Sequence, residues 1–493
     1  MKKNKILMVC SELAPYANVG DLGEVVKSLS SSLDERGHDV RIIIPLYKKI
    51  LSENIFALQN ISSISTITTG NNSQFPVAFW QTRLEKNITL YFLQNDFYFT
   101  ARHKIYGYVD DAYRFVFFNL AVVKFLLSLD WIPDIILTYD WHTALISSYL
   151  KFYDKKLNSI PNIFTIHDIK YQGKTDPDVL TFADLPEDLF HPDSLEFFGK
   201  LNLMKSGIIY SDLIITTSEL YATEIQTVEC GAGLGGLLQA KNNWIKGVVH
   251  GIDYNKYDPQ TDDNIAANYS TSNIIGKIEC KKTLQKELNL PVHSEIPIMV
   301  IPGRLIDKTA YSMLLFLAEY LKRLEVQIII LESRFSEFEE AIKKIPIRSN
   351  CLITNVDTNW RDNPKLWAGA DMLLLPVRAN SFHKELLLAL RYGVIPIVYG
   401  VNDLDKDFMD NFDKTAKGKA FVFSPYNSKS LFKTFRYAFD TYNKVALWTM
   451  LIKNALSVDV SWENTVNKYI KIMGMFHDKS HYEEYSDDVI SKI

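Results

Sequence analysis

Residues 371–400 read DMLLLPVRANSFHKELLLALRYGVIPIVYG, and this stretch decides the predicted fold. Its beginning, 372–377, is a continuous apolar run that predicts a strand buried on both faces. A polar loop, 378–384, and leucines at helical spacing come next, and a second apolar run follows at 394–399. This order predicts a βαβ unit with parallel strands. Ligands of open α/β sheets bind at the carboxyl ends of such strands, next to a helix N-terminus that favours anions, so the loop is the first candidate for function.

The length and composition indicate a soluble protein with more than one domain. The chain has 493 residues, too many for one ordinary core, and a net charge of -4 gives no reason to expect nucleic acid or an anionic membrane as a partner. Its four cysteines form no Cys-x-x-Cys pair, which argues against a zinc site and fits a reducing cytosol. We therefore expect a cytoplasmic protein with no metal ion, no cofactor, no signal peptide and no membrane span.

The first half of the sequence alternates apolar runs with helical patterns. Runs of strand length are predicted at 6–10, 40–45, 134–138, 162–166 and 213–217, and a helix is predicted at 21–36. The runs at 63–69, 77–82 and 88–93 are predicted as antiparallel additions to an edge. This rhythm is typical of a doubly wound sheet.

A second rhythm begins with a short predicted strand at 247–251 and a polar linker at 253–269. Six strands are then predicted, at 298–302, 326–331, 351–355, 372–377, 395–399 and 421–423. The predicted fold class is α/β, with two Rossmann-like doubly wound domains. The predicted boundaries are a first domain at 1–245, a second at 246–455, a crossing helix at 456–480 and a tail at 481–493.

Five loops at predicted strand carboxyl ends are candidates to line a ligand site between two such domains. Their histidine, arginine and lysine side chains suit an anionic, phosphorylated ligand. These loops are 11–21, 139–143, 167–173, 303–308 and 378–384.

Several collinear motifs carry a resemblance to a known family. They include MVCSELAPYANVGDLGEVV at 8–26, YDWHTAL at 139–145, FTIHDIKYQG at 164–173, HGIDYNKYDPQTD at 250–262, LRYGVIPIV at 390–398 and SWENTVNKYIKI at 461–472. Over residues 5 to about 475 the chain resembles the bacterial glycogen synthases and plant starch synthases. These are retaining GT-B glucosyltransferases that extend α-1,4-glucan from ADP-glucose. The resemblance implies two domains facing across a cleft, with a helix at 461–475 that returns to the first domain.

The resemblance also implies roles for individual residues. The catalytic group is His167, Arg304, Asn380 and Asp140. The donor-binding group is Asn18, Gly20, Lys308, Thr309, His383 and Lys384, and the acceptor-binding group is His142, Tyr171 and Gln172. We expect His167, Arg304 and Asn380 to approach one another across the cleft, with Asp140 and His142 behind them.

The donor-binding positions depart from the family pattern. Asn18 stands where the family has a lysine that contacts the donor phosphates, and Asp21 replaces the second of two glycines after it. Thr309 replaces a second phosphate-binding lysine, although Lys308 lies one position earlier. A carboxylate near backbone N–H groups that should hold a diphosphate repels the donor.

The loop at 380–384 departs further, because it reads NSFHK where the family has EPCGL. Asn380 keeps hydrogen-bonding capacity but has no charge to stabilise an oxocarbenium-like centre. One hypothesis is that His383, Lys384 or Glu385 replaces the missing groups.

Alternatives remain open at single residues and for the whole protein. His167 could instead be a histidine of the core, and Arg304 could form an ion pair with Asp307. Trp141 and His142 could serve packing and helix capping. For the protein, the hypotheses are a divergent ADP-glucose-dependent glucosyltransferase and a catalytically silent relative. The silent relative binds glucan or associates with a true glycogen or starch synthase.

Overall fold

The computed structural model of the chain describes residues 3–52, 58–85, 87–303, 308–321, 323–331, 351–378, 384–400, 408, 410–412 and 417–477. The chain divides into two compact units. Unit 1 comprises residues 1–217, 222–248 and 465–493, and unit 2 comprises residues 218–221 and 249–464. Each unit is described by itself.

Unit 1 is built on a mostly parallel sheet. Its described strands run in the order β14-β13-β9-β8-β1-β2-β7-β6-β3. They are β1 (Lys5–Val9), β2 (Asp39–Pro45), β3 (Gln59–Asn60), β6 (Ala78–Arg83), β7 (Thr89–Gln94), β8 (Ile135–Tyr139), β9 (Asn162–Ile166), β13 (Leu213–Thr216) and β14 (Ile245–Gly247). The strands predicted at 6–10, 40–45, 134–138, 162–166 and 213–217 are confirmed, with small shifts at their ends.

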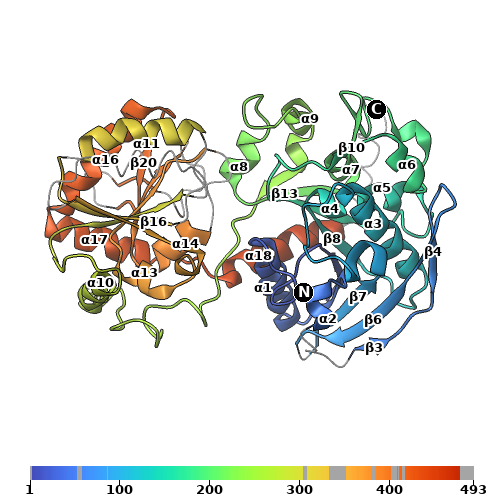
Figure 1. The fold of residues 1–493 in the computed structure, drawn as a ribbon, viewed down its shortest axis with the longest axis horizontal. Helices are drawn as coiled ribbons and strands as arrows, with labels where there is room; N and C mark the ends of the chain where they lie inside the picture. Colours follow the sequence, from blue (N-terminus) through green and yellow to red (C-terminus); the bar gives the residue numbers. More distant parts are fainter. Residues whose placement is uncertain are drawn as a thin grey trace. The chain divides into compact units, whose positions relative to one another are not determined.

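Helices cover the faces of this sheet (Figure 1). The helix predicted at 21–36 is α1 (Leu22–Glu35), which buries the apolar side of its surface, including Val26, Leu29 and Leu33. On the other face, α5 (Leu145–Phe152) packs against both α3 (Asp111–Leu127) and α7 (Leu203–Tyr210). Shorter described helices of this unit are α2 (Lys48–Ser52), α4 (Asp140–Thr143), α6 (Asp178–Phe182) and α9 (Gly235–Ala240), and α8 (Glu219–Glu224) lies where the chain passes between the units.

Two small sheets complete unit 1. One consists of β4 (Thr66–Thr68) and β5 (Gln74–Pro76), which pair antiparallel. The other has the order β10-β12-β11, with β10 (Lys174–Thr175), β11 (Glu196–Phe197) and β12 (Lys200–Asn202). This second small sheet continues the loop that follows β9, so it extends from the carboxyl edge of the main sheet.

Three predictions for unit 1 are wrong. The run at 63–69 contains β4, which pairs with β5 in a separate sheet and not at the edge of the main one. The run at 88–93 forms β7, which lies inside the main sheet, parallel to β2 on one side and antiparallel to β6 on the other, and is not an edge strand. The run at 247–251 does not begin the second sheet, because β14 ends at Gly247 and pairs parallel with β13 in the first one. Strand partners far apart in the chain decide the cases of β7 and β14, and apolar periodicity contains no information about them.

Unit 2 has a six-stranded sheet among its described residues, in the order β17-β16-β15-β18-β19-β20, and its described pairs are parallel. The strands are β15 (Ile298–Pro302), β16 (Val326–Leu331), β17 (Cys351–Val356), β18 (Met372–Leu375), β19 (Ile395–Tyr399) and β20 (Phe421–Phe423). All six were predicted at these places. Its described helices include α10 (Gly276–Glu287), α11 (Lys308–Leu321), α13 (Pro364–Gly369), α14 (Lys384–Arg391), α16 (Ser428–Tyr442) and α17 (Val445–Leu456).

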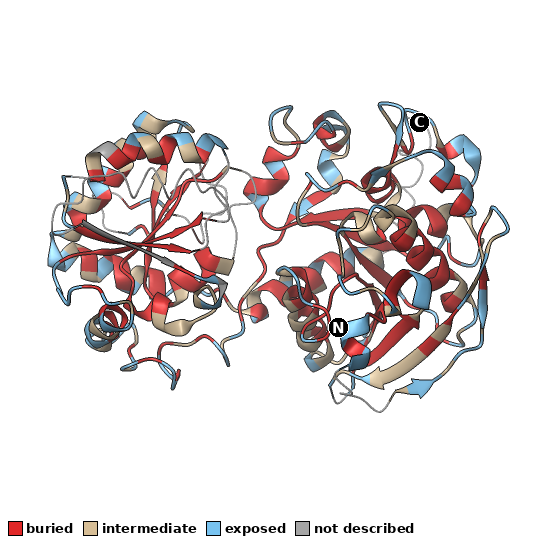
Figure 2. Cartoon of the chain, in the orientation of Figure 1, coloured by how far each residue is buried: buried red, intermediate tan, exposed pale blue. Residues whose placement is uncertain are grey.

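The core of unit 2 lies between its sheet and its helices. The central strands of both large sheets are buried, and so are the helix faces that pack on them, as Figure 2 shows in red. In unit 2, α11 and α16 pack together, and α14 packs against α17 (Figure 1). The segment 253–269, predicted as a polar linker, is instead anchored in this core by Tyr257, Ile265 and Tyr269.

The C-terminal helix predicted at 461–475 is present as α18 (Trp462–Gly474). From Thr465 onward its residues belong to unit 1. The Arg36 side chain of α1 donates a 2.8 Å hydrogen bond to Asn467 Oδ1, and the buried Tyr469 hydroxyl is hydrogen-bonded to Thr165 of β9. The two Rossmann-like units of the predicted fold class are thus confirmed. Among the described residues, no helix combines the length and apolarity that crossing a membrane requires.

Candidate functional site

Three loops of unit 1 meet at the carboxyl edge of its sheet. The strands β9, β8 and β1 are neighbours and run parallel, so the residues that follow them are brought together. Ser11 and Glu12 follow β1, Asp140 and His142 follow β8, and His167 follows β9. The structure therefore groups the sequence-predicted residues Asp140, His142 and His167, and it adds Glu12 to them.

Asp140 holds His167 from two sides. Its Oδ1 accepts a 2.8 Å hydrogen bond from the His167 backbone N–H, and its Oδ2 lies 3.2 Å from His167 Nδ1. Asp140 has a positive φ of +54°, in the left-handed region that aspartate tolerates better than most residues, and its carboxylate reaches across to the end of β9. Burial favours the neutral acid, but the adjacent His167 outweighs it and lowers the pKa of Asp140. An ionised Asp140 thus fixes the orientation of the His167 ring.

His142 is neutral because most of its ring, including Nδ1, is shielded from water. Burial, opposed by Asp140 and assisted by Arg114, lowers the pKa of His142 from 6.5 to about 3. Its Nδ1 is buried and has no hydrogen-bond partner among the described residues. The ring lies between two others, with centroid distances of 4.7 Å to Tyr106 and 4.1 Å to Trp141. A neutral imidazole can donate a hydrogen bond to an uncharged hydroxyl group, such as that of a sugar, or accept one from it.

Tyr106 is a site residue that the sequence interpretation missed. Its hydroxyl is 2.8 Å from Ser11 Oγ and donates a 2.8 Å hydrogen bond to Glu12 Oε1. Burial and the nearby Glu12 carboxylate raise its pKa well above the usual value, so the hydroxyl stays protonated. Tyr106 comes from an irregular segment before α3, and no spacing in the sequence relates it to His142. A tyrosine between an acidic residue and a histidine is visible only in the folded unit.

The Glu12 carboxylate accepts hydrogen bonds from backbone N–H groups of the glycine-containing loop before α1. Its Oε2 accepts hydrogen bonds from Val19 N–H at 2.6 Å and from Gly20 N–H at 3.1 Å. Asn18, which was predicted to bind the donor, turns its Oδ1 back to Gly23, where it lies 2.6 Å from the position of an added Cβ. The protein's own carboxylate thus takes two donors that a diphosphate could otherwise use.

The predicted acceptor-binding residues after β9 have different surroundings. Tyr171 is 63% exposed, whereas Gln172 is buried. Gln172 Nε2 donates to the carbonyl oxygens of Ile169 and Ala232, both at 3.0 Å, and its Oε1 accepts from Asn202 Nδ2 at 2.8 Å. The Gln172 amide therefore holds three segments together, and Tyr171 is the residue of this pair that reaches the surface.

In unit 2, the predicted residues belong to the chain segments that follow β15 and β18, which are neighbours in the sheet. Arg304, Asn380 and His383 lie outside the described residues, so their predicted roles and the expected approach of His167, Arg304 and Asn380 stay predictions. Lys308 and Thr309 form the exposed first turn of α11.

Lys384 and Glu385, at the start of α14, both have ionic partners within unit 2. Lys384 Nζ is 2.8 Å from Asp362 Oδ1, and Glu385 Oε1 accepts a 2.7 Å hydrogen bond from Arg361 Nε. Glu385 is fully buried. These ion pairs favour a structural role for the two residues over the hypothesis that they replace missing donor-binding or catalytic groups.

The fold and this site define a class of protein, the glycosyltransferases with two Rossmann-like domains. Residues 5–240 match the family described as the starch synthase catalytic domain. The chain is 35% identical over 479 residues to the glycogen synthase of Thermosipho africanus, covering 95% of this chain and 98% of that one. It is 34% identical over 474 residues to the glycogen synthase of Clostridium beijerinckii, with the same coverage. The chain therefore belongs to the glycogen synthase and starch synthase family.

A solved structure supports the same assignment over both units. The catalytic domain of starch synthase IV from Arabidopsis thaliana, bound to ADP and acarbose, has a TM-score of 0.83 to this chain at 26% identity. The similarity covers 96% of this chain and 99% of that one. The GT-B fold that the resemblance implied is thus confirmed.

Proposed function

We propose that the protein transfers glucose from ADP-glucose to the non-reducing end of an α-1,4-glucan, and that it does so more slowly than family members with an intact donor site. The observation that carries the proposal is the grouping of ionised Asp140, oriented His167 and neutral His142 at one sheet edge. Such a set can bind uncharged sugar hydroxyls with fixed geometry. The related plant starch synthase binds ADP and acarbose, which supports a nucleotide and a saccharide as ligands.

Binding of the ADP-glucose donor is expected to be the weakest step of the proposed reaction. Asn18 and Thr309 provide no positive charge where the family has lysines, and Asp21 adds a negative charge to the loop before α1. A charge-assisted hydrogen bond contributes about 1.5–3 kcal/mol. Two missing ones therefore reduce donor affinity by about 10²-fold or more, since each ~1.4 kcal/mol is a factor of ten.

The second candidate is a catalytically silent relative that binds glucan or regulates a true synthase. Two observations favour it. Asn18 and Thr309 stand where the family has two phosphate-binding lysines, and Lys384 and Glu385 are paired inside unit 2 with Asp362 and Arg361. Both candidates bind the glucan, so they differ in whether the protein binds and uses the nucleotide-sugar donor.

A titration calorimetry experiment with ADP and ADP-glucose separates the candidates, combined with transfer of labelled glucose to glycogen. The proposal predicts measurable but weak donor binding, slow transfer, and loss of transfer in Asp140→Asn, which removes the charge that orients His167. Phe316→Ala, a change on the exposed side of α11, is the control that should retain transfer. No donor binding at millimolar concentration would reject the enzyme and favour the silent relative, while micromolar affinity with rapid turnover would reject the proposed weakening.

A further inference from the structure

An exposed phenylalanine stands at the tip of a tight hairpin in unit 1. β11 and β12 pair antiparallel, with Phe197 opposite Lys200, so Phe198 and Gly199 form a two-residue turn. Both turn residues have positive φ, +50° for Phe198 and +77° for Gly199. Asparagine, aspartate and glycine are the usual residues at the first position of such a turn. A bulky side chain there is strained.

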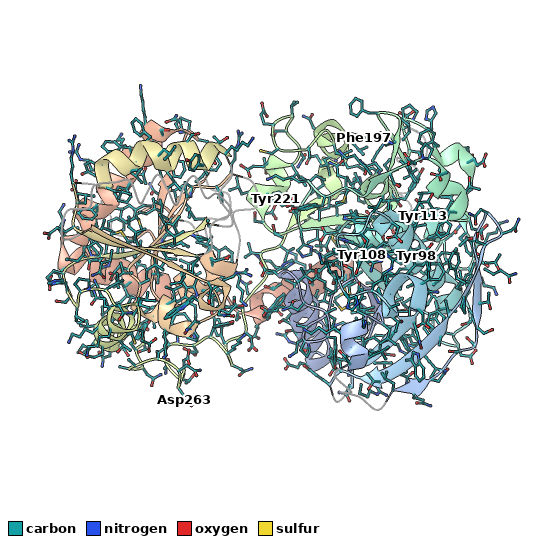
Figure 3. The ribbon with its side chains drawn as sticks, in the orientation of Figure 1. Tyr98, Tyr108, Tyr113, Phe197, Tyr221 and Asp263 are labelled. Atoms are coloured by element: carbon teal, nitrogen blue, oxygen red, sulfur yellow. The ribbon has the colours of Figure 1, made fainter. Side chains whose placement is uncertain are left out.

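The turn presents apolar surface to water at this strained position. Phe198 is 87% exposed, and its ring centroid is 4.7 Å from that of Phe197, nearly perpendicular to it (Figure 3 labels Phe197). The turn is held by Glu196 Oε1, which accepts a 2.6 Å hydrogen bond from Gly199 N–H. Neither the strained backbone of Phe198 nor the exposure of its ring stabilises the fold. Their combination at one residue therefore suggests a binding role.

The hairpin is rigidly joined to the loop that carries Tyr171. β10 pairs with β12, with Lys174 opposite Asn202, and Asn202 also donates to the buried Gln172. On the other side, Phe197 packs on Gly233, which lies in the loop before α9. An added Cβ on Gly233 would lie 2.8 Å from the Phe197 ring. The rings are therefore part of the same small sheet as the proposed acceptor-binding loop.

The charged side chains around the rings are of both signs, Lys174 and Lys200 with Asp176 and Glu196. Lys200 Nζ is 2.5 Å from Asp176 Oδ1, and Lys174 Nζ lies 5.5 Å from the centroid of the Phe197 ring. An uncharged ligand with an apolar face and hydroxyl edges fits this surface better than a charged peptide or a nucleic acid. Pyranose rings have this character, since their axial C–H groups stack on aromatic rings while their hydroxyls remain in water.

We infer that the Phe197–Phe198 hairpin is a second α-glucan-binding site, which holds a distant part of a long chain whose end enters the acceptor site. The inference rests on the proposed function for the identity of the ligand. It adds that long, branched acceptors bind more tightly than short ones through this hairpin. The contribution is one of multivalency, because the second contact is made within an already bound chain.

Electrophoresis through native gels that contain glycogen tests this inference, with the apparent Kd taken from the retardation. Phe198→Asn, which suits the turn conformation, should raise the apparent Kd for glycogen about three- to tenfold, the range of one aromatic contact. Phe198→Trp should stay within about twofold of the natural protein. Phe316→Ala, which removes a 52% exposed phenylalanine from unit 2, is the matched control and should not change retardation.

The outcomes separate this inference from the proposed function. If transfer to maltotriose is found but Phe198→Asn migrates as the natural protein does, the hairpin site is rejected and the proposed function stands. If no transfer is found but retardation depends on Phe198, the hairpin site stands and the enzyme is rejected. If light scattering shows a dimer that Phe198→Asn dissociates, with unchanged retardation, the hairpin is a contact between copies and the inference is overturned.

Discussion

His142 should make unit 1 sensitive to acid, and the substitution His142→Phe should remove this sensitivity. Phenylalanine keeps a ring between Tyr106 and Trp141 but has no proton to bind. In the folded unit, burial lowers the pKa of His142 to about 3, whereas the ordinary value is 6.5. Between these values the unfolded chain binds more protons than the folded one, so the free energy of unfolding rises with pH and is lost as the pH falls from 6.5 toward 3.

The magnitude follows from the two pKa values. At pH 5 the unfolded state is stabilised by protonation of this histidine by about 2 kcal/mol, and at pH 7.5 by almost nothing. Hydrogen exchange of peptides that cover β8 and β9 reports the free energy of opening of unit 1 separately from unit 2. The natural protein should lose about 2 kcal/mol more than His142→Phe between pH 7.5 and pH 5. Contributions of all other groups cancel in this comparison.

Equal losses in the two proteins, within about 0.5 kcal/mol, would contradict the argument. They would mean that water reaches the His142 ring in the folded unit and that it is protonated there with an ordinary pKa. In that case the neutral imidazole invoked for sugar binding would be absent at mildly acidic pH. A larger loss in the variant would likewise refute a buried, uncharged His142.

Three further predictions concern other parts of the chain. Lys277 donates hydrogen bonds to three backbone carbonyls, and burial lowers its pKa to about 8. Between pH 7 and pH 9 the free energy of unfolding of the natural protein should therefore rise by about 1 kcal/mol more than that of Lys277→Met in urea unfolding, and an equal rise in both would contradict this. Gly173→Ala should destabilise unit 1 by about 2 kcal/mol or more in hydrogen exchange, because φ is +62° and the new Cβ would lie 2.4 Å from the Trp141 ring; an unchanged stability would show that the loop relaxes. The double change Asn18→Lys and Thr309→Lys should lower the Kd for ADP about tenfold or more at low salt, by calorimetry, and the gain should shrink as salt is added; an unchanged Kd would place the diphosphate elsewhere.

The strands of unit 2 could be predicted from the sequence because they are buried on both faces. Runs such as Ile298–Pro302 and Ile395–Tyr399 are apolar throughout, and every residue in them is buried in the structure. Such a run has few alternatives to a central parallel strand. The same reasoning could not assign β7, because its neighbours β2 and β6 run in opposite directions and both pairings suit its apolar residues.

By itself, the sequence determined the family, the two Rossmann-like units and the positions of Asp140, His142 and His167 after strands, because motifs and apolar periodicity are local properties of a chain. Only the tertiary structure decided which groups face one another. It placed Tyr106 between Glu12 and His142, and it let the Glu12 carboxylate take the N–H groups of the loop before α1. It also paired Lys384 and Glu385 with Asp362 and Arg361. Hydrogen bonds and ion pairs depend on distances of about 3 Å between residues far apart in the chain. Folding sets those distances, and no spacing along the sequence encodes them.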